Sequence, residues 1–277
     1  LPLAERVKRK ATLLFDAHEF APAEWEEFAK WRLLIRPYVL WCLKALKSVD
    51  LMTTICAGIQ GEYKKSYGID SEVITNACRY FDLAPKPVQE PIRMIYTGIA
   101  HPGRHIDQAV QILKMLDLRF HLDMILVPGM EKVIAEIKEL AKDEPRIRFL
   151  EPVPLEEIVP FCNRYDIGFF PLIPTNRNVH HGLGNKFFEF IQARLCLALS
   201  PLQEMARLTK QYDCGVVAQD FSDEAFASML NALSSSEIRR KKENASQAAL
   251  ALSLDANWAA LDRFLESCDV AAQIASK

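Results

Sequence analysis

The chain has 277 residues, half of them hydrophobic, which is enough for a buried core and for two domains. Its formal net charge is −2, so it carries no overall field that attracts nucleic acid, and we expect no nucleic-acid partner. No run of eighteen apolar residues occurs, so we also expect no transmembrane helix.

The first part of the chain alternates strand and helix patterns. Strands are predicted within 11–20, 51–58 and 71–77, and helices within 22–50, interrupted at Pro37, and within 59–68. These strands are few for a doubly wound sheet, and the first residue is Leu1 rather than methionine. We therefore expect a processed, trimmed or fragmentary chain whose earlier strands are missing. The proline-rich stretch "LAPKPVQEP" predicts a linker over 84–91.

From Arg93 onward the alternation is regular. Strands are predicted within 92–98, 122–129, 146–152, 165–172, 195–200 and 214–220. Helices are predicted near 105–117, 131–142, 155–164, 185–193 and 202–212. Strands that are apolar on both faces indicate an α/β, Rossmann-like domain with a parallel sheet covered on both sides. After a capping serine, Ser234, the chain is predicted helical to its end, with an apolar stripe through Trp258, Leu261, Phe264 and Leu265.

Ligands of open parallel sheets bind beyond the carboxyl ends of the strands. The longest predicted strand-end loop, "PLIPTNRNVHHGLGN", leads into a helix at 185–193. Gly182 and Gly184 permit close approach to a ligand, and the helix start offers free N–H groups to an anion. Lys186 adds a charge, and Glu189 could accept two hydrogen bonds from a ribose diol. The alternative is that Asn185 only caps the helix while Lys186 and Glu189 form a local surface pair.

These segments resemble the C-terminal half of GT-B glycosyltransferases, in particular the large retaining family 4. The stretches that match in order and spacing are "IYTGIAHPGRHIDQAV", "LVPGM", "RIRFLEPVPLEEIVPFCNRYDIGFFPL" and "HGLGNKFFEFIQARLCLALS". The variant "NKFFEF" is similar to a subgroup that makes bacterial surface polysaccharides and lipid-linked glycans. Upstream, "FDAHEF" and "VITNAC" resemble strand ends of the acceptor domain.

The resemblance implies the GT-B fold, with two Rossmann-like domains of which the first is partial. It implies an acceptor-side domain at 1–83, the linker at 84–91, a nucleotide-sugar-binding domain at 92–253, and a helix at 254–277 that returns to the first domain. The family's glycine-rich acceptor-side loop would precede Leu1. The chain as given could therefore be inactive even if the whole protein works.

The resemblance also assigns roles to individual residues. Glu189 matches the glutamate that binds the nucleotide ribose, and His18 matches the active-site histidine beside the transferred sugar. Asn185 and Lys186 lie where the family touches the donor phosphates, and Arg104 stands at a phosphate-binding lysine position. The remaining residues of the implied donor site are Gly98, Val153 (through its backbone, beside the base), His181, Gly182 and Gly184.

Two positions depart from the family pattern. His181 stands where the first glutamate of the motif is expected, which changes the contacts available to the sugar hydroxyls. Ile99 stands where an arginine is expected, which removes one of two cations that would stabilise the departing diphosphate.

Histidines and cysteines allow other interpretations. His18 could be a structural hydrogen bonder, although Asp16 and Glu19 offer carboxylates that would orient its ring. His101, His105, His180 and His181 lack a matching carboxylate or cysteine set, so we expect no metal. The scattered cysteines, with no CxxC pair, indicate reduced thiols of a cytoplasmic protein: Cys42, Cys56, Cys78, Cys162, Cys196, Cys214 and Cys268.

Residues 28–49 contain five basic side chains and no acidic one, interleaved with aromatic and aliphatic residues. Such a segment could lie on an anionic membrane, at the inner face of which a lipid-linked acceptor would wait. The alternative is a core helix with a solvated basic face.

Taken together, the sequence predicts a retaining hexosyltransferase-type glycosyltransferase of bacterial polysaccharide or glycolipid synthesis. It would move a sugar from a UDP- or GDP-linked donor to a hydroxyl of a saccharide or lipid-linked acceptor, without an obligatory metal or other cofactor. A non-catalytic GT-B-like subunit that binds a partner glycosyltransferase is the alternative from another class. A sugar-nucleotide epimerase, which shares the architecture, is a third.

Overall fold

The structure is a computed structural model that describes residues 1–8 and 11–275, with side chains up to residue 267. By contacts the chain divides into two compact units. The first contains residues 1–76, 174–183 and 256–277, and the second contains 77–173 and 184–255. The domain boundaries expected from the sequence stay a prediction. No helix in the described part of the chain is long and apolar enough to cross a membrane.

The first unit is built on a parallel sheet with strand order β1-β2-β3. Its strands are β1 (Leu14–Ala17), β2 (Leu51–Thr54) and β3 (Glu72–Val73). Its helices are α1 (Pro2–Val7), α2 (Arg36–Cys42), α3 (Ala57–Tyr67), α7 (Arg177–His181) and most of α12 (Leu254–Ala275). The α3 helix ends at Gly68, which adopts φ 70° and donates its N–H to Lys64 O. Glycine takes this left-handed conformation without strain, so the sequence fixes the helix end.

The helix expected at 22–50 is not interrupted at Pro37. A 3-10 turn at Ala21–Ala23 comes first, and a π-helix at Trp31–Ile35 then runs directly into α2 and a 3-10 stretch at Leu43–Ser48. Pro37 occupies the first turn of α2, directly after the π-helix, and the helical run continues through it. The chain changes from π-helix to α-helix after Ile35 instead of breaking at Pro37.

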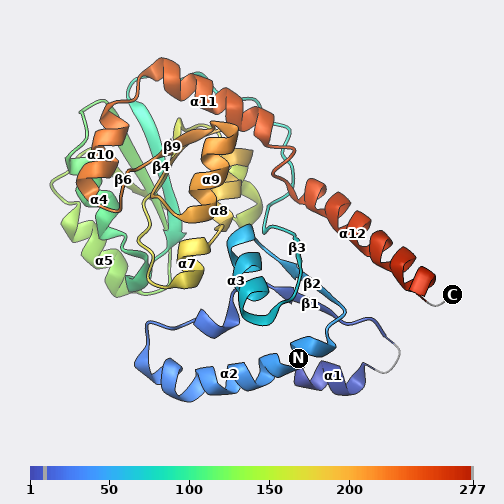
Figure 1. Cartoon of the computed structure of the whole chain (residues 1–277). Coiled ribbons are helices and arrows are strands. Elements are labelled where there is room, and N and C mark those ends of the chain that lie inside the picture. Colours follow the sequence, from blue (N-terminus) through green and yellow to red (C-terminus); the bar gives the residue numbers. More distant parts are fainter. Residues whose placement is uncertain (9–10, 276–277) are drawn as a thin grey trace. The chain divides into compact units, whose positions relative to one another are not determined.

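The second unit is a doubly wound sheet with strand order β6-β5-β4-β7-β8-β9, all in parallel. Its strands are β4 (Ile92–Ile99), β5 (Phe120–Val127), β6 (Ile147–Leu150), β7 (Ile167–Phe170), β8 (Cys196–Leu199) and β9 (Gly215–Val217). The helices between and after them are α4 (Asp107–Lys114), α5 (Glu131–Leu140), α6 (Ile158–Cys162), α8 (Asn185–Gln192), α9 (Gln203–Tyr212), α10 (Asp223–Asn231) and α11 (Ser235–Ala248). The strands expected from residue 92 onward and the helices expected up to residue 212 are confirmed (Figure 1), whereas α10 was not expected and the helix expected from Ser234 to the end is interrupted between α11 and α12.

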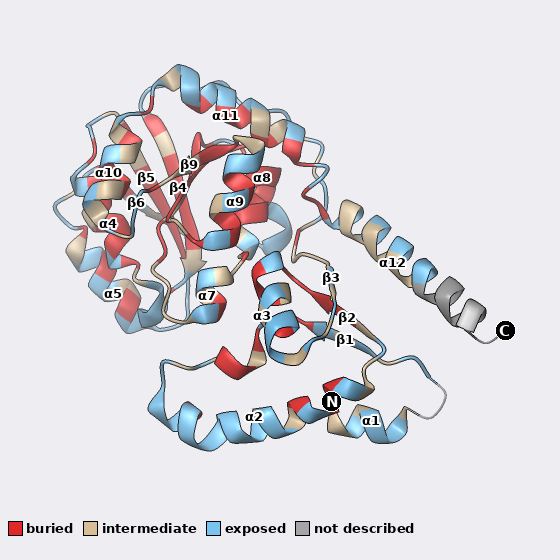
Figure 2. Cartoon of the chain, in the orientation of Figure 1, coloured by how far each residue is buried: buried red, intermediate tan, exposed pale blue. Residues whose placement is uncertain are grey.

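Helices cover both faces of this sheet. On one face, α4, α5 and α10 share a buried core with Met94, Leu122 and Phe169 (Figures 1 and 2). On the other face, α8 packs so closely on β7 that a Cβ at Gly168 would lie 2.5 Å from the ring of Phe190. Glycine at this position lets α8 approach the backbone of β7 closely.

The end of the chain follows the expected pattern in part. Ser234 caps α11 in a capping box with Glu237, as its sequence position predicts. In α12, Asn257 donates to Thr75 O at 2.7 Å, and Leu261, Phe264 and Leu265 are half-buried. The expected apolar stripe does not include Trp258 as a packed member, because its side chain is 56% exposed.

Candidate functional site

The second unit has a topological switch point between β4 and β7. From β4 the chain builds outward through β5 to β6, and from β7 it builds the other way through β8 to β9. The chain therefore leaves these neighbouring strands in opposite directions, and ligands of open parallel sheets bind beyond the strand ends at such a point. Gly98 lies at the end of β4, Arg104 in the segment after it, and α8 after β7.

The start of α8 lacks a side-chain cap. Gly184 occupies the cap position, and Asn185 is the first helical residue, so the expectation that Asn185 caps the helix is wrong. The N–H of Phe187 donates to Gly184 O at 3.0 Å, and among the described residues no side-chain cap bonds this first turn. An uncapped helix start with its positive dipole end is an anion-binding arrangement.

Lys186 and Glu189 form the local pair that the alternative interpretation expected. Lys186 Nζ lies 2.8 Å from Glu189 Oε2. The pair is not a surface pair, however, because the Glu189 side chain is only 7% exposed. Lys186 is a quarter exposed, so the carboxylate holds the ammonium over the first turn of α8 while leaving it open to solvent.

The environment of Glu189 explains its dependence on Lys186. Burial, reinforced by the negative charge of Glu189, raises the pKa of Cys78 to about 11 and the pKa of Cys162 to about 12. These thiols stay protonated at neutral pH, so they add no second negative charge beside the carboxylate. A buried carboxylate needs a partner of opposite charge, and Lys186 provides it.

Arg104 ends a 3-10 turn at Pro102–Arg104 whose cap is His101. His101 Nδ1 accepts a hydrogen bond from Gly103 N–H at 3.2 Å, so this histidine has a structural role in the turn. Arg104 is exposed, and within residues 1–8 and 11–267 no carboxylate forms an ion pair with it. Burial raises the pKa of the Tyr96 phenol to about 12, and the positive charge of Arg104 partly offsets this rise. The guanidinium therefore stands over the end of β4, available to an anion.

The other donor-site residues predicted in this unit lie at the same edge of the sheet but further apart. Val153 follows β6, which is two strands from β4, or roughly 10 Å at normal strand spacing. Gly98 lies within β4, where an added Cβ would be 3.4 Å from the Tyr96 ring. Both remain predicted contacts.

In the first unit, His18 follows β1 and is oriented as the sequence predicts. Its Nε2 lies 2.9 Å from Asp16 Oδ2, and Asp16 Oδ1 accepts a hydrogen bond from Thr53 Oγ1 at 2.7 Å. Asp16 and Thr53 are register partners in β1 and β2. Glu19 makes no such bond: burial raises its pKa, the charge of Glu24 adds to this, and His18 opposes it. Sequence reasoning missed Thr53 because only strand register brings it to Asp16.

His181 and Gly182 belong by contact to the first unit, together with α7. His181 packs on α3, where a Cβ at Gly58 would lie 2.5 Å from its Nδ1, and its Nε2 is 3.4 Å from Glu62 Oε1. Asn178 exchanges hydrogen bonds with the backbone N–H and C=O of Phe20. The predicted contacts of His181 and Gly182 with a donor stay a prediction.

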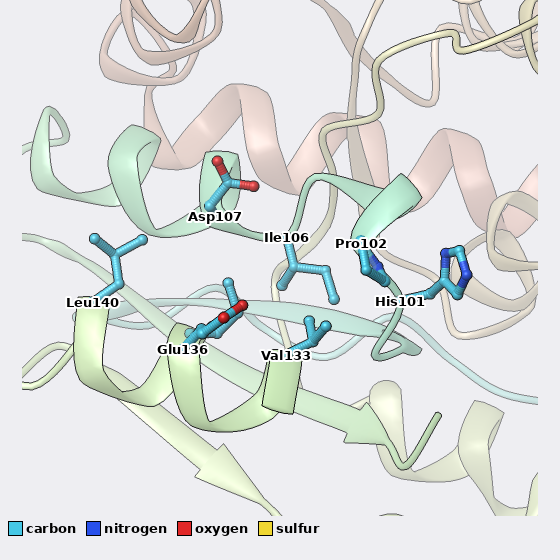
Figure 3. Close-up of a pocket in the computed structure, with 8 residues that line it drawn as sticks. His101, Pro102, Ile106, Asp107, Val133, Glu136 and Leu140 are labelled. Carbon is cyan, nitrogen blue, oxygen red and sulfur yellow. The ribbon is translucent and has the colours of Figure 1, made fainter. Parts of the chain in front are cut away.

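Two cavities of the second unit are lined by other residues than the donor-site residues predicted from the sequence. One of about 360 Å³ opens between α4 and α5 (Figure 3) and is lined by His101, Pro102, Ile106, Asp107, Val133, Glu136, Ile137 and Leu140. Its carboxylates, Asp107 and Glu136, would repel a diphosphate. The other, of about 320 Å³, lies toward the amino ends of β4, β5 and β6, where Asp123 is bonded to Arg148 at 2.6 and 2.8 Å. We therefore locate the candidate site by the strand ends and the helix start.

Metal-binding side chains do not gather in this site. Among the described residues, no three or more histidine, cysteine, aspartate or glutamate side chains are grouped so that they could hold a metal ion. Among the cysteines whose side chains are described there is no disulfide, and Cys268 lies outside them. That activity needs no metal stays a prediction.

No protein-family model and no curated protein matches the sequence, but solved structures match its fold. A Staphylococcus aureus TarM variant in complex with fondaparinux, alpha-GlcNAc-glycerol and UDP aligns over 92% of this chain and 51% of its own, with a TM-score of 0.71 and 9% identity. WaaG, a glycosyltransferase involved in lipopolysaccharide biosynthesis, aligns over 88% and 73%, with a TM-score of 0.66 and 16% identity. The chain has the GT-B fold.

A third structure of this fold extends the match to the whole chain. The alpha,alpha-trehalose 6-phosphate synthase from Burkholderia multivorans aligns over 100% of this chain and 70% of its own, with a TM-score of 0.72 and 11% identity. The predicted α/β class with parallel sheets is thereby confirmed. This chain spans from about half to about three quarters of the length of these glycosyltransferase and synthase structures.

Proposed function

We propose that this protein is a glycosyltransferase that moves a sugar from a nucleoside-diphosphate donor to a hydroxyl of a saccharide or lipid-linked acceptor. The observation that carries the proposal is the uncapped start of α8 beside the switch point, with Lys186 held 2.8 Å from the buried Glu189. A diphosphate needs N–H donors and cations, and a ribose diol needs a carboxylate one turn further on. The fold neighbours support this, because one of them was solved with UDP.

The proposed chemistry uses this chain's own charges. The diphosphate would accept hydrogen bonds from the backbone N–H groups of Asn185 and Lys186, and would gain positive charge from Lys186 and Arg104. Lys186 bonds Oε2 of Glu189, which leaves Oε1 to accept a ribose hydroxyl. As the bond to the sugar breaks, negative charge grows on the leaving diphosphate, and these fixed groups stabilise it without a metal.

The other predicted roles belong to the same proposal. The backbone around Val153 would contact the base of a UDP- or GDP-linked donor. His18, oriented by Asp16, would lie beside the transferred sugar, which would keep its anomeric configuration. The work of the protein would be bacterial surface polysaccharide or glycolipid synthesis at the cytoplasmic side of the membrane.

Calorimetric titration with UDP, GDP and their sugars tests the proposal. We expect one of the two nucleotides to bind, and we expect Arg104→Gln and Lys186→Gln to weaken binding by roughly tenfold or more each. Lys132→Gln is the matched control, because Lys132 is a helix lysine that is 82% exposed and pairs only with Glu136 among the described residues. Failure of both nucleotides to bind would refute the transferase. Product analysis by NMR then reports whether the anomeric configuration is retained.

A non-catalytic GT-B-like subunit is the second candidate, and two positions favour it. Ile99 stands where an arginine would help the diphosphate leave, and His181, in place of a glutamate, is packed on α3. This candidate predicts tight association with a partner glycosyltransferase and no turnover of any bound sugar nucleotide. Turnover by the purified protein alone excludes it.

A further inference from the structure

Residues 28–44 of the first unit expose an apolar surface that a soluble helix would normally bury. Side-chain exposures are 74% for Leu33, 64% for Leu34 and 63% for Tyr38. Figure 2 shows α2 and the turn before it as exposed over most of their length. The full set of exposed large apolar residues in the segment is Phe28, Leu33, Leu34, Ile35, Tyr38, Leu40 and Trp41. Patches of this kind mark interaction sites.

The segment is anchored by a different set of side chains. Trp31 is 8% exposed and Leu43 is 3% exposed, and Leu46, just after the segment, is 2% exposed. The core-helix interpretation therefore accounts only for these anchors. The exposed apolar side chains do not belong to this buried set, so packing within the described part of the unit does not account for their hydrophobicity.

The charges of this surface are positive and unneutralised. Lys30, Arg32, Arg36 and Lys44 are exposed, and the sequence from 28 to 49 holds no acidic residue. Arg32 donates to the backbone carbonyls of Glu26 and Glu27, and Arg36 donates to that of Pro22. Backbone carbonyls hold the guanidinium groups in place without cancelling their charge. Through the part of the chain that the structure describes, none of these four cations forms an ion pair with a carboxylate.

We infer that residues 28–44 bind the surface of an anionic lipid bilayer. Leu33 and Leu34, the most exposed of these side chains, lie between Arg32 and Arg36 in the sequence, so they can enter the acyl region while the cationic side chains stay near the phosphates. Tyr38 and Trp41, whose rings stack with centroids 5.7 Å apart, are the residue types that settle at the headgroup level. Because the described helices cannot cross a membrane, the contact is peripheral.

Charge also argues against a second copy of the chain as the occupant. Two such surfaces face to face would bring the same cations together with no acidic residue between them. An anionic bilayer supplies the opposite charge and an apolar layer at once. The inference does not rest on sugar transfer, so it stands or falls independently of the proposed enzyme.

Co-sedimentation with vesicles tests the inference in the absence of any nucleotide. The protein is mixed with phosphatidylcholine vesicles that contain phosphatidylglycerol, and with vesicles of phosphatidylcholine alone, at low and at moderate salt. We expect binding to the anionic vesicles only, weakened by salt. Arg32→Gln with Arg36→Gln should lower the partition coefficient roughly 30-fold.

A second pair of substitutions distinguishes a loss of vesicle binding from misfolding. Leu33→Ser with Leu34→Ser changes side chains that are already in water, so the thermal unfolding temperature should not fall, while vesicle binding should drop roughly tenfold or more. Lys132→Gln with Lys138→Gln, on α5 of the second unit, removes the same charge elsewhere and should bind vesicles as the unaltered protein does.

Three results would overturn the inference. The unaltered protein could fail to sediment with anionic vesicles, or both 28–44 variants could bind as well as the α5 control. Sedimentation-velocity analysis could also show a dimer that Leu33→Ser with Leu34→Ser dissociates, without vesicle binding. That last outcome would assign the surface to a second copy of the chain.

Discussion

Replacing Glu189 by glutamine isolates the carboxylate that the proposed ribose contact requires. Glutamine keeps the side-chain volume in a position that is 7% exposed, and it removes the charge that now faces Lys186 Nζ at 2.8 Å. A hydrogen bond to a charged acceptor contributes about 1.5–3 kcal/mol. At about 1.4 kcal/mol per tenfold, UDP should bind roughly 10- to 140-fold more weakly.

Folding stability should change much less. Lys186 is a quarter exposed and can turn into water when its partner is gone, so the free energy of unfolding should fall by about 1 kcal/mol or less. Binding is measured by titration calorimetry and stability by urea denaturation.

Glu204→Gln is the matched control for this substitution. Glu204 is likewise a buried glutamate, 2% exposed, that pairs three residues on with a part-exposed cation, Arg207, at 3.1 Å. It sits on α9, which follows β8 rather than β7. We expect Glu204→Gln to match Glu189→Gln in stability and to leave UDP affinity unchanged. Equal losses of affinity in both variants would refute the ribose role, because they would trace the effect to helix packing.

Further predictions concern the framework of the site. Gly168→Ala places a Cβ 2.5 Å from the Phe190 ring and should lower the free energy of unfolding, measured by urea denaturation, by about 1–3 kcal/mol. The control is Gly61→Ala, where nothing lies within 4 Å of the added Cβ, and it should raise the free energy of unfolding by about 0.5–1 kcal/mol. A Gly168→Ala protein of unchanged stability would contradict the close packing of α8 on β7. Burial raises the pKa of Asp123, but hydrogen bonds from Arg148 and Tyr165 outweigh it, so the folded pKa lies below the unfolded value of about 3.9. The resulting stabilisation is present above that pH and is lost as the pH falls through the folded pKa, so Asp123→Asn should flatten the acid limb of a stability profile; an unchanged limb would speak against it. Burial raises the pKa values of Cys162, Cys196 and Cys214 to about 12, so these thiols should react with a disulfide reagent at pH 8 only after denaturation, as a mass-spectrometric time course would show.

Most strands and helices of the second unit could be predicted because most of its strands are largely buried and apolar. Runs such as Ile92–Ile99 have no solvated side, so their hydrophobicity alone separates them from the amphipathic helices between them. The first unit was harder to predict. The β3 strand has only two residues, and α7 is a five-residue helix in a polar stretch whose contacts with α3 and Phe20 come from distant parts of the chain.

The site was predictable in its residue types and less so in its geometry. Sequence spacing indicated that Lys186 and Glu189 would meet, because residues three apart lie on one face of a helix. It did not indicate that Glu189 would be buried, since burial depends on how α8 packs against β7 through Gly168. For residues 28–44, the sequence also left the burial of the side chains undecided. Their apolar content could not distinguish a core helix from a surface one until the packing of Trp31 and Leu43 showed which side chains are anchors.

A crystal structure of the protein with UDP would test the central claim most directly. The account predicts diphosphate oxygens within about 2.7–3.2 Å of the backbone N–H groups of Asn185 and Lys186, with a ribose hydroxyl at the Glu189 carboxylate. A nucleotide bound elsewhere, such as between α4 and α5, or a Glu189 carboxylate without a ribose contact, would contradict it.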